Sequence, residues 1–203
     1  MPTYHPHPAV AHLAAMVENL PVKTGKTVED WAALVTTEGP ADDKERKAWL
    51  KAEFGLGGPT SMLILNQVNG TQADFASDEA YLAAAPRFVD DMYSGKKAHL
   101  RPIHDALIAR VEALGEDVKI SPATTMVPVY RHHVFAQVRP ATNSRVDLGL
   151  GLGRYEEALP KRIIETGGAA KGDRITHRIG LEAVEDIDDE VVRWLETAYA
   201  LDA

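Results

Sequence analysis

The spacing of the apolar residues changes near residue 118, and that change constrains the fold most. Before it, apolar residues recur every three or four positions, as in Ile103, Leu107 and Val111, which predicts amphipathic helices. After it, short alternating segments lie between turn residues, which indicates antiparallel strands. A helical pattern returns at 188–201. The chain is therefore expected to be α+β: a small N-terminal helical module, then an antiparallel sheet of four or five strands flanked by helices.

Five segments are expected as strands, because each is β-branched or alternating. These segments are 118–120, 126–131, 134–139, 145–152 and 174–181. Successive side chains of a strand point to opposite faces of the sheet. We place on the buried face Val146, Leu148, Leu150, Leu152, Ile175, His177, Ile179 and Leu181. The open face then carries Arg145, Asp147, Gly149, Gly151, Arg174, Thr176, Arg178 and Gly180.

The chain is expected to have three parts. Residues 1–22 are predicted to form an N-terminal arm and a short helix, and residues 23–70 a three-helix module. Residues 79–203 are predicted to form the α+β domain. The segment 69–78 is short, polar and contains glycine, so we expect it to link the module to the domain.

Caps and prolines set the expected helix ends. Thr27 and Asp30 have the spacing of a capping box. The first helix is expected to end at Leu20–Pro21 and a later helix to break near Pro86, because proline removes a backbone donor and clashes with the preceding turn. Pro102 is compatible with its helix only in the first turn.

Charge is segregated along the chain. Residues 119–178 carry ten Lys or Arg against five acidic residues, a net of +5, whereas the remainder carries twelve against 25, a net of −13. A basic block in an acidic protein predicts a surface that meets an anion. The overall charge of −8 opposes indiscriminate binding to nucleic acid, so any such binding is expected to be local.

The chain contains no cysteine. This excludes disulfides, thiol nucleophiles and thiolate metal sites, and it agrees with a reducing, cytoplasmic location. Residues 9–17 are apolar, but His12 interrupts them and no basic residue precedes them, so we expect no signal peptide. No apolar run approaches the length of a bilayer span, and we expect no membrane partner.

Several stretches of the second half have a specific order and spacing. They are Arg101-Pro-Ile-His-Asp-Ala-Leu107, Arg131 through Phe135-Ala136, Arg139-Pro-Ala-Thr-Asn-Ser-Arg145-Val-Asp-Leu-Gly-Leu150, Ile175-Thr-His-Arg-Ile179, and Ile187-Asp-Asp-Glu190 through Trp194. Together they resemble a bacterial family known as domain of unknown function 5655. Lys23-Thr-Gly-Lys-Thr27 through Phe54-Gly-Leu-Gly57 resembles its frequent neighbour, domain of unknown function 4287. The resemblance covers about Lys23 to Tyr199 and implies a two-module architecture but no activity.

The chain departs from the family that it resembles at two places. The family pattern has lysines where this chain has Ala123-Thr124, and a basic tetrad where it has Arg131-His132-His133-Val134. Histidine is charged only when it is protonated. If the family binds an anion at this face, the resemblance implies a weaker affinity for this chain near neutral pH.

The open sheet face is the candidate binding site. Basic residues lie at its ends, and its glycines leave room for a ligand to approach the backbone. The alternative is a solvated face whose glycines accommodate the loop 154–173. The anion-binding candidates, with Lys161 and Arg162 on a closing loop and the two histidines as a pH-sensitive rim, are Arg131, His132, His133, Arg139, Arg145, Lys161, Arg162, Arg174 and Arg178.

Other kinds of site have little support. Gly149-Leu-Gly-Leu-Gly153 is not a dinucleotide fingerprint, because its sixth position is Arg154 and its glycines lie within a strand. No nucleophile elbow occurs. His99 and His104 are five residues apart and project from different sides of a helix, unlike zinc ligands four apart. We expect no catalytic residue, no metal site and no cofactor.

Three functions remain open. The sequence favours a non-enzymatic cytoplasmic module that binds nucleic acid or a small anion. The alternative is a protein-interaction or homo-oligomeric assembly module. The second alternative is an enzyme in which the Gly-rich loop 153–172 closes over the sheet, although no nucleophile–base pair is identifiable. A deep pocket enclosing two of Arg131, His132, His133 and Glu165 would favour the enzyme.

Overall fold

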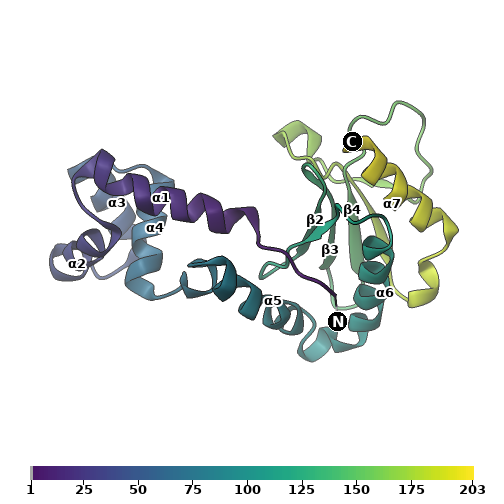
Figure 1. Ribbon diagram of the computed structural model, residues 1–203, viewed down its shortest axis with the longest axis horizontal. Helices are drawn as coiled ribbons and strands as arrows, with labels where there is room; N and C mark the ends of the chain where they lie inside the picture. The colour runs from purple at the N-terminus through teal and green to yellow at the C-terminus, as the bar shows by residue number, and fades with distance from the viewer. Residues whose placement is uncertain (1) are drawn as a thin grey trace. The chain divides into compact units, whose positions relative to one another are not determined.

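The computed structural model describes residues 2–203 (Figure 1). They divide into two compact units, a helical unit of residues 6–84 and a sheet unit of residues 2–5 and 85–203. The boundaries of these two units differ from the boundaries of the three predicted parts, which are 1–22, 23–70 and 79–203. Met1 lies outside the described residues.

The helical unit is a four-helix cluster followed by a short turn of helix. Its helices are α1 (Pro8–Thr24), α2 (Val28–Glu38), α3 (Asp43–Phe54), α4 (Gly58–Asn69) and η1 (Ala73–Phe75). The capping box that starts α2 is confirmed, since the Asp30 amide donates to Thr27 Oγ1 at 3.1 Å and the Thr27 amide to Asp30 Oδ2 at 3.0 Å. Helix α4 packs against the other three, around Trp31, Val35, Leu50 and Ile64.

Two helices continue through prolines that were expected to end or break them. Helix α1 continues past Pro21 to Thr24, and α5 (Asp78–Met92) continues past Pro86. Each proline deprives only the carbonyl four residues earlier of its donor. Those carbonyls belong to Val17 and Leu82, two residues that are 37% and 38% exposed. Burial of neighbouring apolar residues then outweighs the cost of the proline.

The sheet unit contains six strands, and the α+β class is confirmed. The strands are β1 (Lys119–Ile120), β2 (Val127–Tyr130), β3 (Val134–Pro140), β4 (Val146–Leu150), β5 (Ile164–Glu165) and β6 (His177–Leu181). Their order is β1-β2-β3-β4-β6-β5, and all neighbours are antiparallel. Strand β5 was not predicted; it has two residues and lies inside the loop 153–172. Near the N-terminus, Tyr4 forms a parallel bridge to Ile120.

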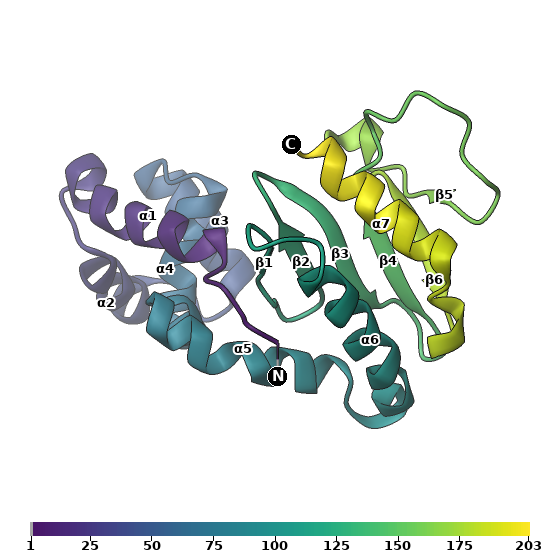
Figure 2. The same ribbon diagram turned by 45° about the vertical axis from the view of Figure 1, so that its right-hand side comes forward.

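The long helices of this unit cover one face of the sheet (Figure 2). Helix α6 (Arg101–Glu112) contacts β3, and α7 (Asp189–Leu201) contacts β3 and β4. Short helical turns connect the elements: η2 (Gly95–Leu100), η3 (Ala169–Lys171) and η4 (Val184–Asp186). The covered face of β4 presents Val146, Leu148 and Leu150, and burial stabilises each by about 1.5–3 kcal/mol. Among the described helices of the sheet unit, none packs on the opposite face, which we call the open face.

His104 is a buried histidine on the inner side of α6. It is 1% exposed and its ring lies 4.8 Å from that of Tyr93. Burial lowers the pKa of His104 to about 4, although the negative charge of Asp105 raises it and that of Arg101 lowers it further. In the unfolded chain a histidine titrates near pH 6.5.

The free energy of unfolding should therefore fall as the pH drops from 6.5 to 4, because only the unfolded state takes up this proton in that range. The expected loss is about 3 kcal/mol. Chemical denaturation at pH 4.5, 5.5, 6.5 and 7.5 measures it. His104→Leu should remove this part of the slope, whereas the exposed control His99→Asn should retain it. An unchanged slope in His104→Leu would contradict the assignment.

Candidate functional site

One buried carboxylate lies among three arginines on the open face. Asp147 of β4 has a side chain only 4% exposed. Arg145 donates from Nε to Asp147 Oδ1 at 2.7 Å, and Arg178 of β6 lies 3.5 Å from the same oxygen through Nη1. Arg139 of β3 is the direct cross-strand neighbour of Asp147. We call Arg139, Arg145 and Arg178 around Asp147 the arginine cluster.

The glycines of the open face are covered by the sheet unit itself. A Cβ atom at Gly149 would lie 2.7 Å from Gln137 Cγ and 2.7 Å from Ile175 Cγ2. A Cβ atom at Gly180 would lie 2.7 Å from Arg145 Cδ. The glycines therefore make room for neighbouring side chains.

The position of Ile175 differs from the prediction. Alternation placed it on the buried face with His177, but β6 begins only at His177. The residues before His177 do not continue the pleat, so Ile175 crosses over Gly149 on the open face, where it is buried. Thr176, expected on the open face, is likewise buried and lies over Gly153.

A second group of predicted residues gathers at the C-terminal end of α7. Arg131 donates to Asp117 Oδ2 at 2.7 Å and stacks 4.4 Å above the ring of Tyr199. Asp202 accepts from the His133 amide at 2.7 Å, and its Oδ1 lies 3.0 Å from His133 Nδ1 and 3.9 Å from Arg174 Nη1. His132 beside them is exposed. Arg131 and Arg174 therefore already have acidic partners.

The third group lies at the N-terminal end of α7. Arg162 Nη1 lies 2.5 Å from Asp188 Oδ2 and 3.5 Å from Glu190 Oε2. Asp188 also caps the helix by accepting from the Val191 amide. Lys161 is exposed next to this group. The nine predicted residues thus occupy three places, and the structure does not assemble them into one face.

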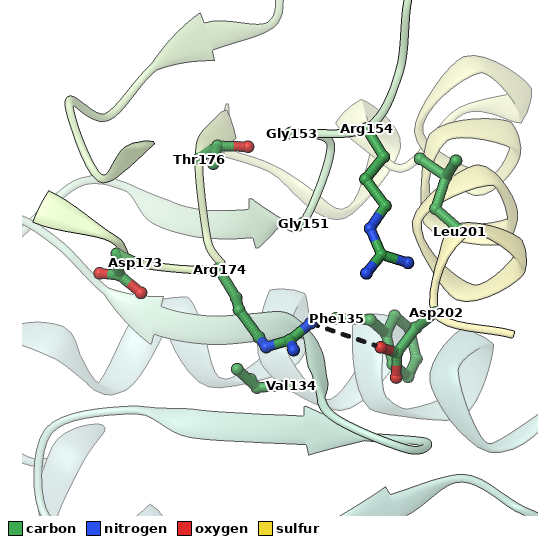
Figure 3. Close-up of a pocket in the computed structure, with 10 residues that line it drawn as sticks. All are labelled: Val134, Phe135, Gly151, Gly153, Arg154, Asp173, Arg174, Thr176, Leu201 and Asp202. Atoms are coloured by element: carbon green, nitrogen blue, oxygen red, sulfur yellow. Dashed lines mark ion pairs between the residues drawn. The ribbon is translucent and has the colours of Figure 1, made fainter. Parts of the chain in front are cut away.

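A pocket of about 160 Å³ opens beside the end of α7 (Figure 3). Arg154 and Arg174 point into it from two sides, and Asp173 and Asp202 also line it. A bulge at Phe135 shapes it, since Val129 pairs with Ala136 and Tyr130 with Val134. Two cations against two carboxylates leave this pocket without net charge, so it is poorly suited to an anion.

A more basic cavity of about 550 Å³ lies at the other end of β3. Its charged groups are Lys96 and Lys97 of η2, Arg139, and one acid, Asp91. We call this cavity the lysine pocket. Its remaining residues are Met92, Ser94, Thr124, Thr125, Pro140, Ala141 and Asn143. All of them belong to the sheet unit.

The lysine pocket joins segments that are distant in the sequence. Lys97 donates from Nζ to the carbonyl of Pro140 at 2.9 Å, which holds η2 against the end of β3. Lys96 and Lys97 are not among the predicted residues, because they precede the basic block 119–178. The only local signal is the pair of adjacent lysines after Ser94-Gly95.

The two histidines are distant from the lysine pocket. His133 precedes β3 and Arg139 lies near its end, so six residues of extended chain separate them. That corresponds to about 20 Å. The arrangement therefore does not place His132 and His133 at the rim of the lysine pocket.

The loop 153–172 borders a further pocket of about 550 Å³. It encloses Glu165, but not Arg131, His132 or His133, so it does not meet the condition that would favour an enzyme. His177 also lines this pocket. Burial lowers the pKa of His177, and the negative charge of Glu165 acts in the opposite direction. Thr176 Oγ1 lies 2.8 Å from His177 Nδ1.

Within residues 2–203, no three His, Cys, Asp or Glu side chains gather where they could hold a metal ion. No helix in this part of the chain has both the length and the apolar character to cross a bilayer.

The close packing over Gly149 is testable by substitution. Gly149→Ala should lower the free energy of unfolding by about 1–3 kcal/mol, because the new Cβ forces Gln137 and Ile175 to move. Gly58→Ala, in the first turn of α4 with nothing within 4 Å of the new Cβ, should leave it unchanged or raise it by up to about 1 kcal/mol. Equal stabilities of Gly149→Ala and the parent protein, measured by urea unfolding, would show that the face is open at Gly149.

Comparison with known families agrees with the resemblance seen in the sequence. Residues 89–202 match the family described as Domain of unknown function (DUF5655), and residues 12–69 match Domain of unknown function (DUF4287). No curated protein and no solved structure matches the chain. Because the first match covers more than half of the 203 residues, the chain belongs to the DUF5655 family, with a DUF4287 module before that domain.

Proposed function

We propose that the sheet unit binds an anionic partner at the arginine cluster and the adjoining lysine pocket, which share Arg139. The observation that carries the proposal is an uncompensated positive charge. Asp147 already has Arg145 and Arg178 as partners. The Arg139 side chain is exposed and makes no hydrogen bond or ion pair with any residue of 2–203.

The chemistry of Arg139 supports this role. A guanidinium presents planar N–H donors that match two oxygens of a carboxylate or phosphate. Arg139 lies on a strand whose backbone is fixed by pairing with β2 and β4. The backbone of Arg139 is therefore fixed in position, while its guanidinium group remains available to a ligand.

The other predicted cations support the proposal less well. Arg131, Arg162 and Arg174 form ion pairs with acids that hold α7 in place. Drawing them to a ligand would leave Asp117, Asp188 or Asp202 without its partner. Binding is therefore proposed at the arginine cluster and lysine pocket, while both ends of α7 are assigned a structural role.

Charge reversal at one residue tests the proposal. Arg139→Glu should weaken binding of labelled single-stranded DNA or RNA and of a fluorescent nucleotide about tenfold at 50 mM salt, because attraction becomes repulsion. For oligonucleotides, the slope of log affinity against log salt should shrink by about 0.7. The measurement is fluorescence anisotropy between 50 and 200 mM salt.

Arg110→Glu is the matched control for Arg139→Glu. Arg110 is an exposed arginine of the same unit, on α6, which covers the opposite face of the sheet. This variant should bind like the parent protein. The proposal fails if none of the probes binds at 50 mM salt, or if Arg139→Glu binds them as tightly as Arg110→Glu does.

A further inference from the structure

The lysine pocket differs from the adjoining arginine cluster because it is a cavity. Its volume of about 550 Å³ lies within the range of about 300–1,000 Å³ that is usual for small-molecule sites. Residues from the end of α5, η2, the β1–β2 connection and the end of β3 converge on it. A cavity assembled from four segments offers several directions of contact to one small ligand.

The charge in the lysine pocket matches a dianion. Lys96, Lys97 and Arg139 provide three positive charges, and Asp91 provides one negative charge. Asp91 also has a positive partner in Arg87, 3.8 Å away. The resulting net charge of about +2 complements a phosphate monoester, which carries about −1.5 to −2 at pH 7.

Hydrogen-bonding groups are also available there. Lys97 donates one of its three N–H groups to the carbonyl of Pro140, so two N–H donors remain for a ligand. The side chains of Thr124, Thr125 and Asn143 make no hydrogen bond within residues 2–203. These groups can donate to several oxygens of one ligand.

Apart from Ser94, the remainder of the lining is apolar. Met92 and Pro140 are buried residues, and Ala141 continues the surface that they begin. Such a surface contributes nothing to a free inorganic ion, but it can pack against the carbon skeleton of a larger molecule. The lining thus offers both charged and apolar groups to one ligand.

We propose that the lysine pocket is a binding site for a small organic phosphate. Lys96, Lys97 and Arg139 hold its phosphate monoester, and the surface of Met92, Pro140 and Ala141 packs against its organic part. This inference rests on the proposed anion-binding function, because Arg139 serves both. It goes further than that function because it names the class of ligand.

The test is binding of a fluorescent AMP labelled on its ribose, compared with the equally labelled adenosine, to the full chain at pH 7.5 and 50 mM salt. The labelled AMP should bind at least tenfold more tightly than the labelled adenosine. Inorganic phosphate should displace it only weakly, because it lacks an organic part.

Variants then locate the site. Lys97→Met keeps most of the side-chain length and removes the charge, so it should weaken AMP binding at least tenfold, whereas Lys97→Arg should remain within about threefold of the parent protein. Lys171→Met, an exposed lysine of η3, is the control and should have no effect. Circular dichroism of each variant verifies folding.

The outcomes separate this inference from the proposed function. AMP binding that needs its phosphate and Lys97 supports both. An oligonucleotide without terminal phosphates that binds through Arg139, while AMP does not bind, overturns the organic-phosphate site and leaves the anion-binding function intact. AMP binding unaffected by Lys97→Met also overturns the site. Absence of binding to both probes overturns both proposals.

Discussion

The burial of Asp147 determines the arrangement of the whole open face. A carboxylate that is almost completely removed from water is tolerated only with positive partners, and Arg145 and Arg178 supply them. Arg145 reaches Asp147 across Gly180, where any side chain would obstruct it. The strand register then leaves Arg139 beside a carboxylate that already has two partners. The free positive charge near the end of β3 is thus a consequence of how one buried aspartate is neutralised.

The fold class could be predicted because its signals are local. Helical and strand periodicities extend over whole elements, and the capping box of Thr27 and Asp30 formed as its spacing indicated. Prediction failed where packing overrides a local rule. Pro21 and Pro86 lie inside helices, and the carbonyls that they deprive of a donor belong to exposed residues. Ile175 lies on the open face and not on the predicted buried face, because alternation does not reveal where the pairing of a strand begins.

The candidate site was harder to predict because charge partners are distant in the sequence. The excess of five basic residues in 119–178 predicts an exposed basic surface. Three of its arginines pair instead with Asp117, Asp188 and Asp202, all outside that window. Conversely, Lys96 and Lys97 lie outside the window and still join Arg139 around one cavity. Counting charges along a chain cannot detect either effect, because both arise from tertiary contacts.

The acidic remainder of the chain bears on which anion is favoured. Residues 6–84 carry six basic against eleven acidic residues, and the whole chain has a net charge of −8. The negative charges of the protein repel every phosphate of a polymer, whereas a small anion is exposed mainly to the electric field within its site. Salt at 0.15 M screens charges beyond about 8 Å, and a concave site with low-dielectric walls concentrates the field within that distance. A cation-lined hollow on an acidic protein is therefore better suited to a single phosphate group than to a nucleic-acid backbone.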